Sequence, residues 1–236
     1  MQYNFLTATN FTAAREGLYQ RARADDGNWT GGRVGSGRLV GTMRGISAPV
    51  MVRWLGDESL VTTATMQAID EATYRAIARA LYWRALNADF LPGGLDLMLF
   101  DFGFNAGISR SARIFQQIIG LSSARLDGDI GPATLQYMDN AALDTICTAI
   151  APAYARQLQQ VLGVAEDGVI GDGTVAALKA ADNGRTRAML YALASRQDLA
   201  YRSFQSFRIN GAGWLNRLSA RLEAALALAS GGMPRV

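Results

Sequence analysis

Residues 112–134 read ARIFQQIIGLSSARLDGDIGPAT, and residues 155–174 read ARQLQQVLGVAEDGVIGDGT. The two stretches share ten identities once the loop of the first is allowed three more residues. In each, apolar residues at helical spacing lead into Asp-Gly, a pair that favours a tight turn, and a second helix can start beyond it. The repeat therefore predicts two helix–turn–helix units, over residues 111–135 and 154–178, which either build the core or bind a ligand.

Helical periodicity also dominates the rest of the chain. It predicts helices over Asn10–Arg23, with Asn10 as N-cap, and over residues 49–55, 70–86 and 95–106. The exception is a segment with seven glycines between Gly27 and Gly45, which is typical of a short hairpin or a glycine-rich loop. We therefore predict a mainly α fold, a helical bundle with one small glycine-rich β-hairpin.

Length and composition indicate a globular protein. The chain has 236 residues, of which 50% are hydrophobic and 18% charged, enough to bury a full core. No stretch approaches the roughly 18 apolar residues of a membrane span, so we expect no stable membrane insertion. The first residues lack the pattern of a secretory signal, so we expect synthesis in the cytoplasm and a separate route of exit.

The residue counts exclude several kinds of active site. The chain has no histidine and a single cysteine, Cys147, so Ser-His-Asp triads, histidine-built zinc sites and internal disulfides are excluded. Cys147 lies in an apolar run and is predicted to be core. The net charge of +3 comes without a basic run, which argues against nucleic-acid binding. The remaining candidates for catalytic side chains are mainly carboxylates, and we expect neither a metal nor an organic cofactor.

Among the glutamates, Glu16 stands out. It faces away from the apolar side of the predicted helix, and Asp25 follows at the start of the glycine-rich segment. A carboxylic acid that protonates a leaving oxygen, opposite a second acidic group, is what a glycosidase needs, and Trp29 offers a ring for stacking on a sugar. The alternative is that Glu16 is a solvated residue paired with a nearby arginine.

Several motifs along the chain point to one known family. They are Glu16-Gly17-Leu18-Tyr19, Asp25 with Gly27-Asn28-Trp29-Thr30-Gly31-Gly32, Gly41-Thr42-Met43-Arg44-Gly45-Ile46-Ser47, Tyr82-Trp83, Leu91-Pro92, Phe100-Asp101-Phe102 with Asn105 and Gly107, the Asp-Gly-x-Ile-Gly elements, and Gly213-Trp214-Leu215-Asn216-Arg217. In order and spacing they resemble the glycoside hydrolase family 108 muramidases of phage endolysins and bacterial secretion activators, with the C-terminal predicted peptidoglycan-binding segment of that family. The resemblance runs from about residue 5 to about residue 220.

The resemblance implies a lysozyme-like helical scaffold that hydrolyses the β-1,4 bond between N-acetylmuramic acid and N-acetylglucosamine. Glu16 takes the place of the catalytic glutamate, Asp25 or its neighbour Asp26 is the second acidic group, and Thr42 or Thr30 positions water. General acid catalysis needs a protonated Glu16 near neutral pH, so we expect it to be partly buried, with Asp25 ionised in wetter surroundings. The expected substrate-binding residues are Tyr19, Asn28, Trp29, Thr30, Asp101 and Asn105. For Asp101 and Asn105, a buried hydrogen-bonded pair is the alternative.

These inferences predict a catalytic region over residues 1–90 and a helical, peptidoglycan-binding-like lobe over residues 91–236. We expect a monomer that acts on the glycan strands of the cell wall, with a holin-like export partner if the source is a phage. Two rival functions remain: a lytic transglycosylase on the same bond, and a non-catalytic peptidoglycan-binding protein.

Overall fold

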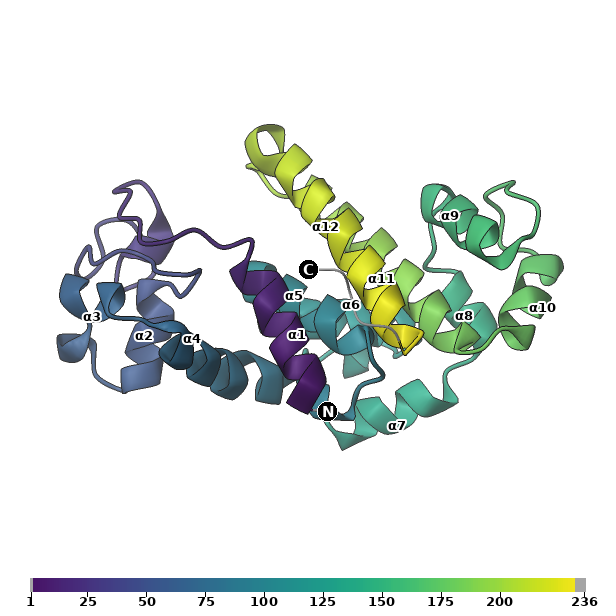
Figure 1. The fold of residues 1–236 in the computed structure, drawn as a ribbon, viewed down its shortest axis with the longest axis horizontal. Helices are drawn as coiled ribbons and strands as arrows, with labels where there is room; N and C mark the ends of the chain where they lie inside the picture. Colours follow the sequence, from purple (N-terminus) through teal and green to yellow (C-terminus); the bar gives the residue numbers. More distant parts are fainter. Residues whose placement is uncertain (1, 232–236) are drawn as a thin grey trace. The chain divides into compact units, whose positions relative to one another are not determined.

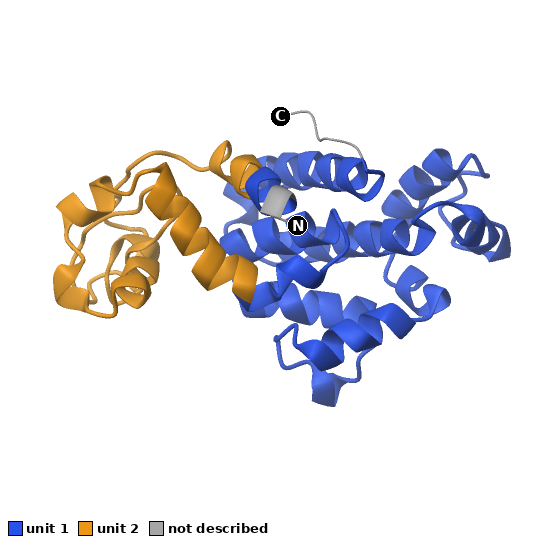
Figure 2. Cartoon of the chain, turned by 60° about the horizontal axis from the view of Figure 1, so that its bottom comes forward, with its two compact units in different colours: residues 1–8, 85–236 blue, residues 9–84 orange. Residues whose placement is uncertain are grey.

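The computed structural model describes residues 2–231, and most of them are helical (Figure 1). This confirms the mainly α fold class. No helix among these residues is long and apolar enough to cross a membrane. The chain divides into two compact units (Figure 2). We call residues 9–84 the loop-rich unit, and residues 1–8 with 85–236 the helical unit.

The loop-rich unit consists of short helices joined by irregular segments. They are the end of α1 (Gln2–Ala13), α2 (Ala48–Leu55), α3 (Thr63–Gln67) and α4 (Glu71–Ala78), with 3₁₀ turns at Asp26–Asn28 and Glu58–Leu60 and a π-helical turn at Arg79–Trp83. Local signals set these boundaries: Asp70 caps α4 by accepting from the Thr73 amide at 2.7 Å, and Gly56 ends α2 with φ 72°. The helices predicted over residues 49–55 and 70–86 are confirmed, the second with a change of pitch after Ala78.

The helix predicted over Asn10–Arg23 is wrong. α1 begins at Gln2 and ends at Ala13, so Asn10 lies inside the helix and Glu16 follows its end. The periodicity failed because the residues after Gly17 pair with a distant segment. The backbones of Gln20 and Thr42 exchange hydrogen bonds of 3.0 and 2.8 Å, which takes the chain out of helical conformation.

The small β-hairpin is also not found. Among the described residues, the glycine-rich segment forms only isolated antiparallel bridges, such as Trp29 with Leu39 and Met43 with Ile46. Gly32, Gly35 and Gly37 all have positive φ, between 71° and 81°, and so interrupt any extended strand. The segment is a folded loop.

The helical unit is built around two long antiparallel helices and α5. Its helices are α5 (Leu95–Ala106), α6 (Ile108–Ile118), α7 (Pro132–Asn140), α8 (Leu143–Cys147), α9 (Pro152–Leu162), α10 (Asp172–Ala180), α11 (Gly184–Arg202) and α12 (Phe207–Ala229), with 3₁₀ turns at Arg84–Leu86, Ala88–Phe90 and Ser123–Arg125. α11 packs against α12 and also against α5, α6, α8, α9 and α10. α5 is buried on all sides over residues 95–103, as its nearly continuous apolar sequence requires. Cys147 is buried, as predicted.

The two sequence repeats fold in the same way, each around one buried glutamine. Gln116 donates to Asp127 Oδ1 at 2.6 Å and to the Asp129 carbonyl at 2.9 Å, and its Oε1 accepts from the Gly128 amide at 3.0 Å.

Gln159 makes the corresponding contacts with Asp167, Val169 and Gly168 at 2.7, 2.9 and 2.9 Å. The shared residues of the repeats therefore hold each loop to its own helix. These internal hydrogen bonds explain, without a ligand, why the glutamine and the aspartate are the same in both repeats.

Candidate active site

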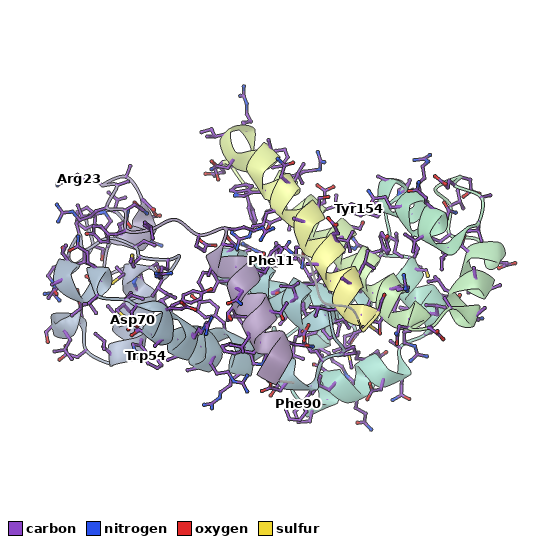
Figure 3. The ribbon with its side chains drawn as sticks, viewed as in Figure 1. Phe11, Arg23, Trp54, Asp70, Phe90 and Tyr154 are labelled. Atoms are coloured by element: carbon purple, nitrogen blue, oxygen red, sulfur yellow. The ribbon has the colours of Figure 1, made fainter. Side chains whose placement is uncertain are left out.

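Glu16 lies in the bend directly after α1 and is half-buried. The helix end is fixed at Phe11, which Figure 3 labels on α1. Arg15 donates to the Phe11 carbonyl at 3.0 Å and places its guanidinium 3.6 Å from the centre of the Phe11 ring. The amide of Glu16 in turn donates to the Ala13 carbonyl at 3.3 Å. The carboxylate therefore stands on a short, anchored turn.

Two side chains from other segments form the electrostatic surroundings of Glu16. Tyr82, from the π-helical turn, is buried, and burial raises its pKa to about 12. The positive charge of Arg53, on α2, lowers this pKa, and the negative charge of Glu16 raises it. Each influence requires the charge to lie near the Tyr82 hydroxyl. The loop-rich unit thus brings together a carboxylate, a phenol and a guanidinium from three elements.

Asp25 and Thr42 are brought together by Gln20. The side-chain amide of Gln20 donates to Asp25 Oδ2 at 2.8 Å, while the backbone of Gln20 pairs with that of Thr42. Asp25 Oδ1 accepts from the Gly27 amide at 2.9 Å, and the Thr42 hydroxyl donates to the Gly27 carbonyl at 3.3 Å. Asp25 is exposed to solvent. Its neighbour Asp26 is also exposed, and its Oδ1 accepts from the Val34 amide at 2.8 Å.

Tyr19 locks the chain after Glu16 onto the glycine-rich loop. Its hydroxyl donates to the Val40 carbonyl at 2.8 Å. Its ring covers Gly41, where an added Cβ would lie 2.6 Å from Tyr19 Cε2 and where φ is +96°. Only glycine fits this approach. Tyr19 therefore sets the path of the chain that follows the candidate acid.

The residues expected to contact sugar from the glycine-rich loop lie in its interior. Asn28 is fully buried, and its amide donates to Gln20 Oε1 at 2.8 Å and to the Ala22 carbonyl at 2.9 Å. Trp29 is only 8% exposed, and its indole N–H donates to the Arg23 carbonyl at 3.0 Å. Its ring is packed within the loop and is not displayed as a stacking platform.

Thr30 has a partner that the sequence did not suggest. Its hydroxyl donates to Glu58 Oε1 at 2.5 Å and accepts from the Arg38 amide at 2.8 Å. The sequence could not reveal this anchor, because 28 residues separate Thr30 from Glu58 and no local pattern connects them.

Asp101 and Asn105 lie on α5, in the helical unit. Asp101 is fully buried and accepts from Arg217 at 2.6 and 3.0 Å and from Arg221 at 2.6 Å. Asn105 is exposed and donates to the backbone carbonyl of Asp101 at 2.8 Å. Burial takes the Asp101 carboxylate away from any glycan. The expected side-chain pair is replaced by an ion pair with two arginines of α12.

Among residues 2–231, no group of three or more cysteine, aspartate and glutamate side chains is placed to hold a metal ion. The chemistry that the loop-rich unit offers is that of a half-buried carboxylic acid near a phenol, with a second, exposed carboxylate on the neighbouring loop.

Residues 9–107 match the family model described as Glycosyl hydrolase 108. Over this segment, the chain is similar to glycosyl hydrolase family 108. The match covers the loop-rich unit and extends through α5, so it includes Glu16, Asp25 and Thr42. It confirms the family resemblance over these residues and supports a peptidoglycan hydrolase in general.

The fold is also similar to a solved structure. The structure of Brucella abortus SagA aligns with a TM-score of 0.57 over 97% of this chain and 97% of that chain, at 23% sequence identity. At this identity the likeness establishes the fold alone. No curated protein is significantly similar in sequence. The family match stops at residue 107, so the C-terminal peptidoglycan-binding segment stays a prediction.

Proposed function

We propose that this family 108 glycoside hydrolase cleaves the β-1,4 bond between N-acetylmuramic acid and N-acetylglucosamine, with Glu16 as the general acid. The observation that carries the proposal is the position of Glu16, half-buried on an anchored turn beside Tyr82 and within the segment that matches the family. As the general acid, Glu16 gives a proton to the glycosidic oxygen as the bond breaks.

Asp25 and Thr42 complete the proposed reaction. The sugar left behind carries developing positive charge, which an ionised carboxylate stabilises or which a water molecule attacks. Asp25 is the exposed carboxylate of the adjoining loop, and Gln20 ties it to the segment that carries the Thr42 hydroxyl. In this proposal Asp25 acts on the sugar or the water, and Thr42 orients the water. Tyr19 and Asn28 hold the loop in place.

The test compares release of soluble muropeptides from purified sacculi by the wild type and by Glu16→Gln. Glutamine keeps the size of the side chain but cannot supply a proton, so we expect a loss of about a hundredfold or more. Glu71→Gln is the matched control, because Glu71 is an exposed residue of the same unit, in the first turn of α4. Equal activity of wild type and Glu16→Gln would exclude Glu16 as the acid.

Mass spectrometry of the released products separates the rival functions. Hydrolysis leaves a reducing muramic acid end, whereas a lytic transglycosylase leaves an anhydro-muramic end. Sacculus binding without products from either protein would instead favour a non-catalytic binding protein.

We also propose that the protein works on the wall as a monomer, and that a holin-like partner releases it if its source is a phage. Binding of sacculi by residues 91–236 is likewise a proposal. The shared glutamine, aspartate and threonine of each repeat are engaged in internal hydrogen bonds, so wall contacts would come from other residues of the lobe.

A further inference from the structure

The end of the α11–α12 hairpin carries an unusual combination of exposed side chains. We call residues 199–216 the hairpin tip; it includes the last turn of α11 and the first turns of α12, and in Figure 1 it projects beyond the other helices of its unit. Ile209 is 85% exposed, more than any other large apolar side chain among the described residues, and Leu199 is 53% exposed. Two exposed large apolar side chains within one short segment make the hairpin tip a candidate interaction surface.

The hairpin tip is rigidly built. Trp214 stacks on Tyr201 with ring centres 5.6 Å apart and an interplanar angle of 24°, and Phe204 meets Trp214 edge-on at 5.7 Å. Phe207 lies 6.5 Å from Trp214 and packs over Gly211, where an added Cβ would be 2.7 Å from its ring. The aromatic rings therefore pack against one another, and Ile209 is not part of this cluster. The exposed side chain is therefore presented on a fixed base.

Positive charge surrounds this base. Arg202 and Arg208 are exposed, and residues 199–216 contain no aspartate or glutamate. The guanidinium of Arg202 lies 5.5 Å from the centre of the Phe207 ring, and that of Arg110, from α6, lies 4.9 Å from the Phe204 ring. The nearest acidic residue along the chain is Asp198, which pairs with Arg202 at 2.6 Å. The net charge around Ile209 is positive.

We propose that the hairpin tip docks onto the surface of an anionic phospholipid membrane. Ile209 would enter the boundary between headgroups and acyl chains, the half-buried aromatic residues would lie at headgroup level, and the arginines would pair with lipid phosphates. Aromatic side chains and arginines favour this interface, and neither a neutral glycan nor a purely apolar partner would use the arginines. Such docking is peripheral and reversible, and salt weakens it.

The test is co-sedimentation of the full chain with vesicles of phosphatidylglycerol and phosphatidylcholine, compared with vesicles of phosphatidylcholine alone. We expect binding only to the anionic vesicles, less at high salt, and roughly fivefold weaker for Ile209→Ser and for Arg208→Gln. Val169→Ser is the matched control: Val169 is 65% exposed in the second repeat of the same unit, and its replacement should leave binding unchanged.

Three results would overturn the proposal. The first is failure of the wild type to bind anionic vesicles, and the second is undiminished binding by both variants at the hairpin tip. The third is a different occupant: a dimer in light scattering that Ile209→Ser dissociates, or sacculus binding that the same variant abolishes, in either case with vesicle binding unchanged. None of these results depends on the activity of Glu16.

Discussion

The loop-rich unit and the helical unit hold their polar residues in different ways. In the helical unit, charged groups are buried and paired: Asp101 lies between Arg217 and Arg221, and Arg221 is itself fully buried. In the loop-rich unit, single side-chain hydrogen bonds hold neighbouring segments together. Examples are the bond from Tyr19 to the Val40 carbonyl and the bond from Thr30 to Glu58.

Because of this difference, we expect substitutions of polar residues to have different effects in the two units. A buried charge that loses its partner affects the stability of the whole unit, because no water replaces the partner. A loop anchor near the surface affects mainly the position of a few residues. We therefore expect substitutions in the helical unit to lower the free energy of unfolding, and substitutions in the glycine-rich loop to lower activity.

The largest effect on stability is expected for Asp101→Asn. It leaves two guanidinium groups without their carboxylate, one fully buried and one nearly so, and such a change lowers the free energy of unfolding by about 3–5 kcal/mol. Denaturant unfolding followed by circular dichroism measures it. The control is Glu71→Gln, which removes the exposed i, i+4 pair with Arg75 and is expected to cost about 0.5 kcal/mol or less. Equal effects of the two variants would remove the contrast between buried and surface pairs.

The sequence predicted the regular parts of both units because their information is local. Apolar spacing placed α5 and α2, and the duplicated Asp-Gly motif placed the helix–turn–helix units. The candidate acid and its partner loop were also predicted from local motifs and stay predictions. Glu16, Asp25 and Thr42 lie within one short stretch of the family match.

The parts that failed depend on contacts distant in sequence. α1 stops at Ala13 because Gln20 pairs with Thr42, and the glycine-rich segment has too many positive φ angles for a hairpin. Asp101 meets Arg217 and Arg221 across 116 and 120 residues. One signal was present: the two arginines are four residues apart, on one face of a helix, and suit a buried acid.

Asp96, in the helical unit, differs from Asp101 because it is buried but hydrogen-bonded only to neutral donors. It accepts from Asn4 at 2.7 Å and from the amides of Gly94 and Leu97 at 2.8 and 2.7 Å. Burial raises its pKa from 3.8 to about 6, and these hydrogen bonds offset only part of the rise.

A folded-state pKa above the unfolded value means that the folded protein favours the proton. The contribution of Asp96 to stability is therefore greatest at pH below 3.8, and it is lost as the pH rises through about 6. Relative to Asp96→Asn, we expect the wild type to gain about 2–3 kcal/mol between pH 7 and pH 4. Unfolding of both proteins over this range measures the difference. A constant difference would mean that Asp96 titrates normally.

A smaller effect on stability than at Asp101 or Asp96 is expected in the loop-rich unit, for Thr30→Val. It removes the hydroxyl that joins Glu58 to the Arg38 amide, at a cost of about 1 kcal/mol, while Thr30→Ser keeps the hydroxyl. If Thr30 is a loop anchor, valine should speed hydrogen exchange of the Arg38 amide and lower muropeptide release several-fold, and serine should restore both. If Thr30 instead contacts sugar, valine should raise KM and leave exchange at Arg38 unchanged. The second result would mean that Thr30 is a substrate contact and not a loop anchor. Tyr19 and Gln20 would then be the remaining loop anchors on which the comparison of the two units depends.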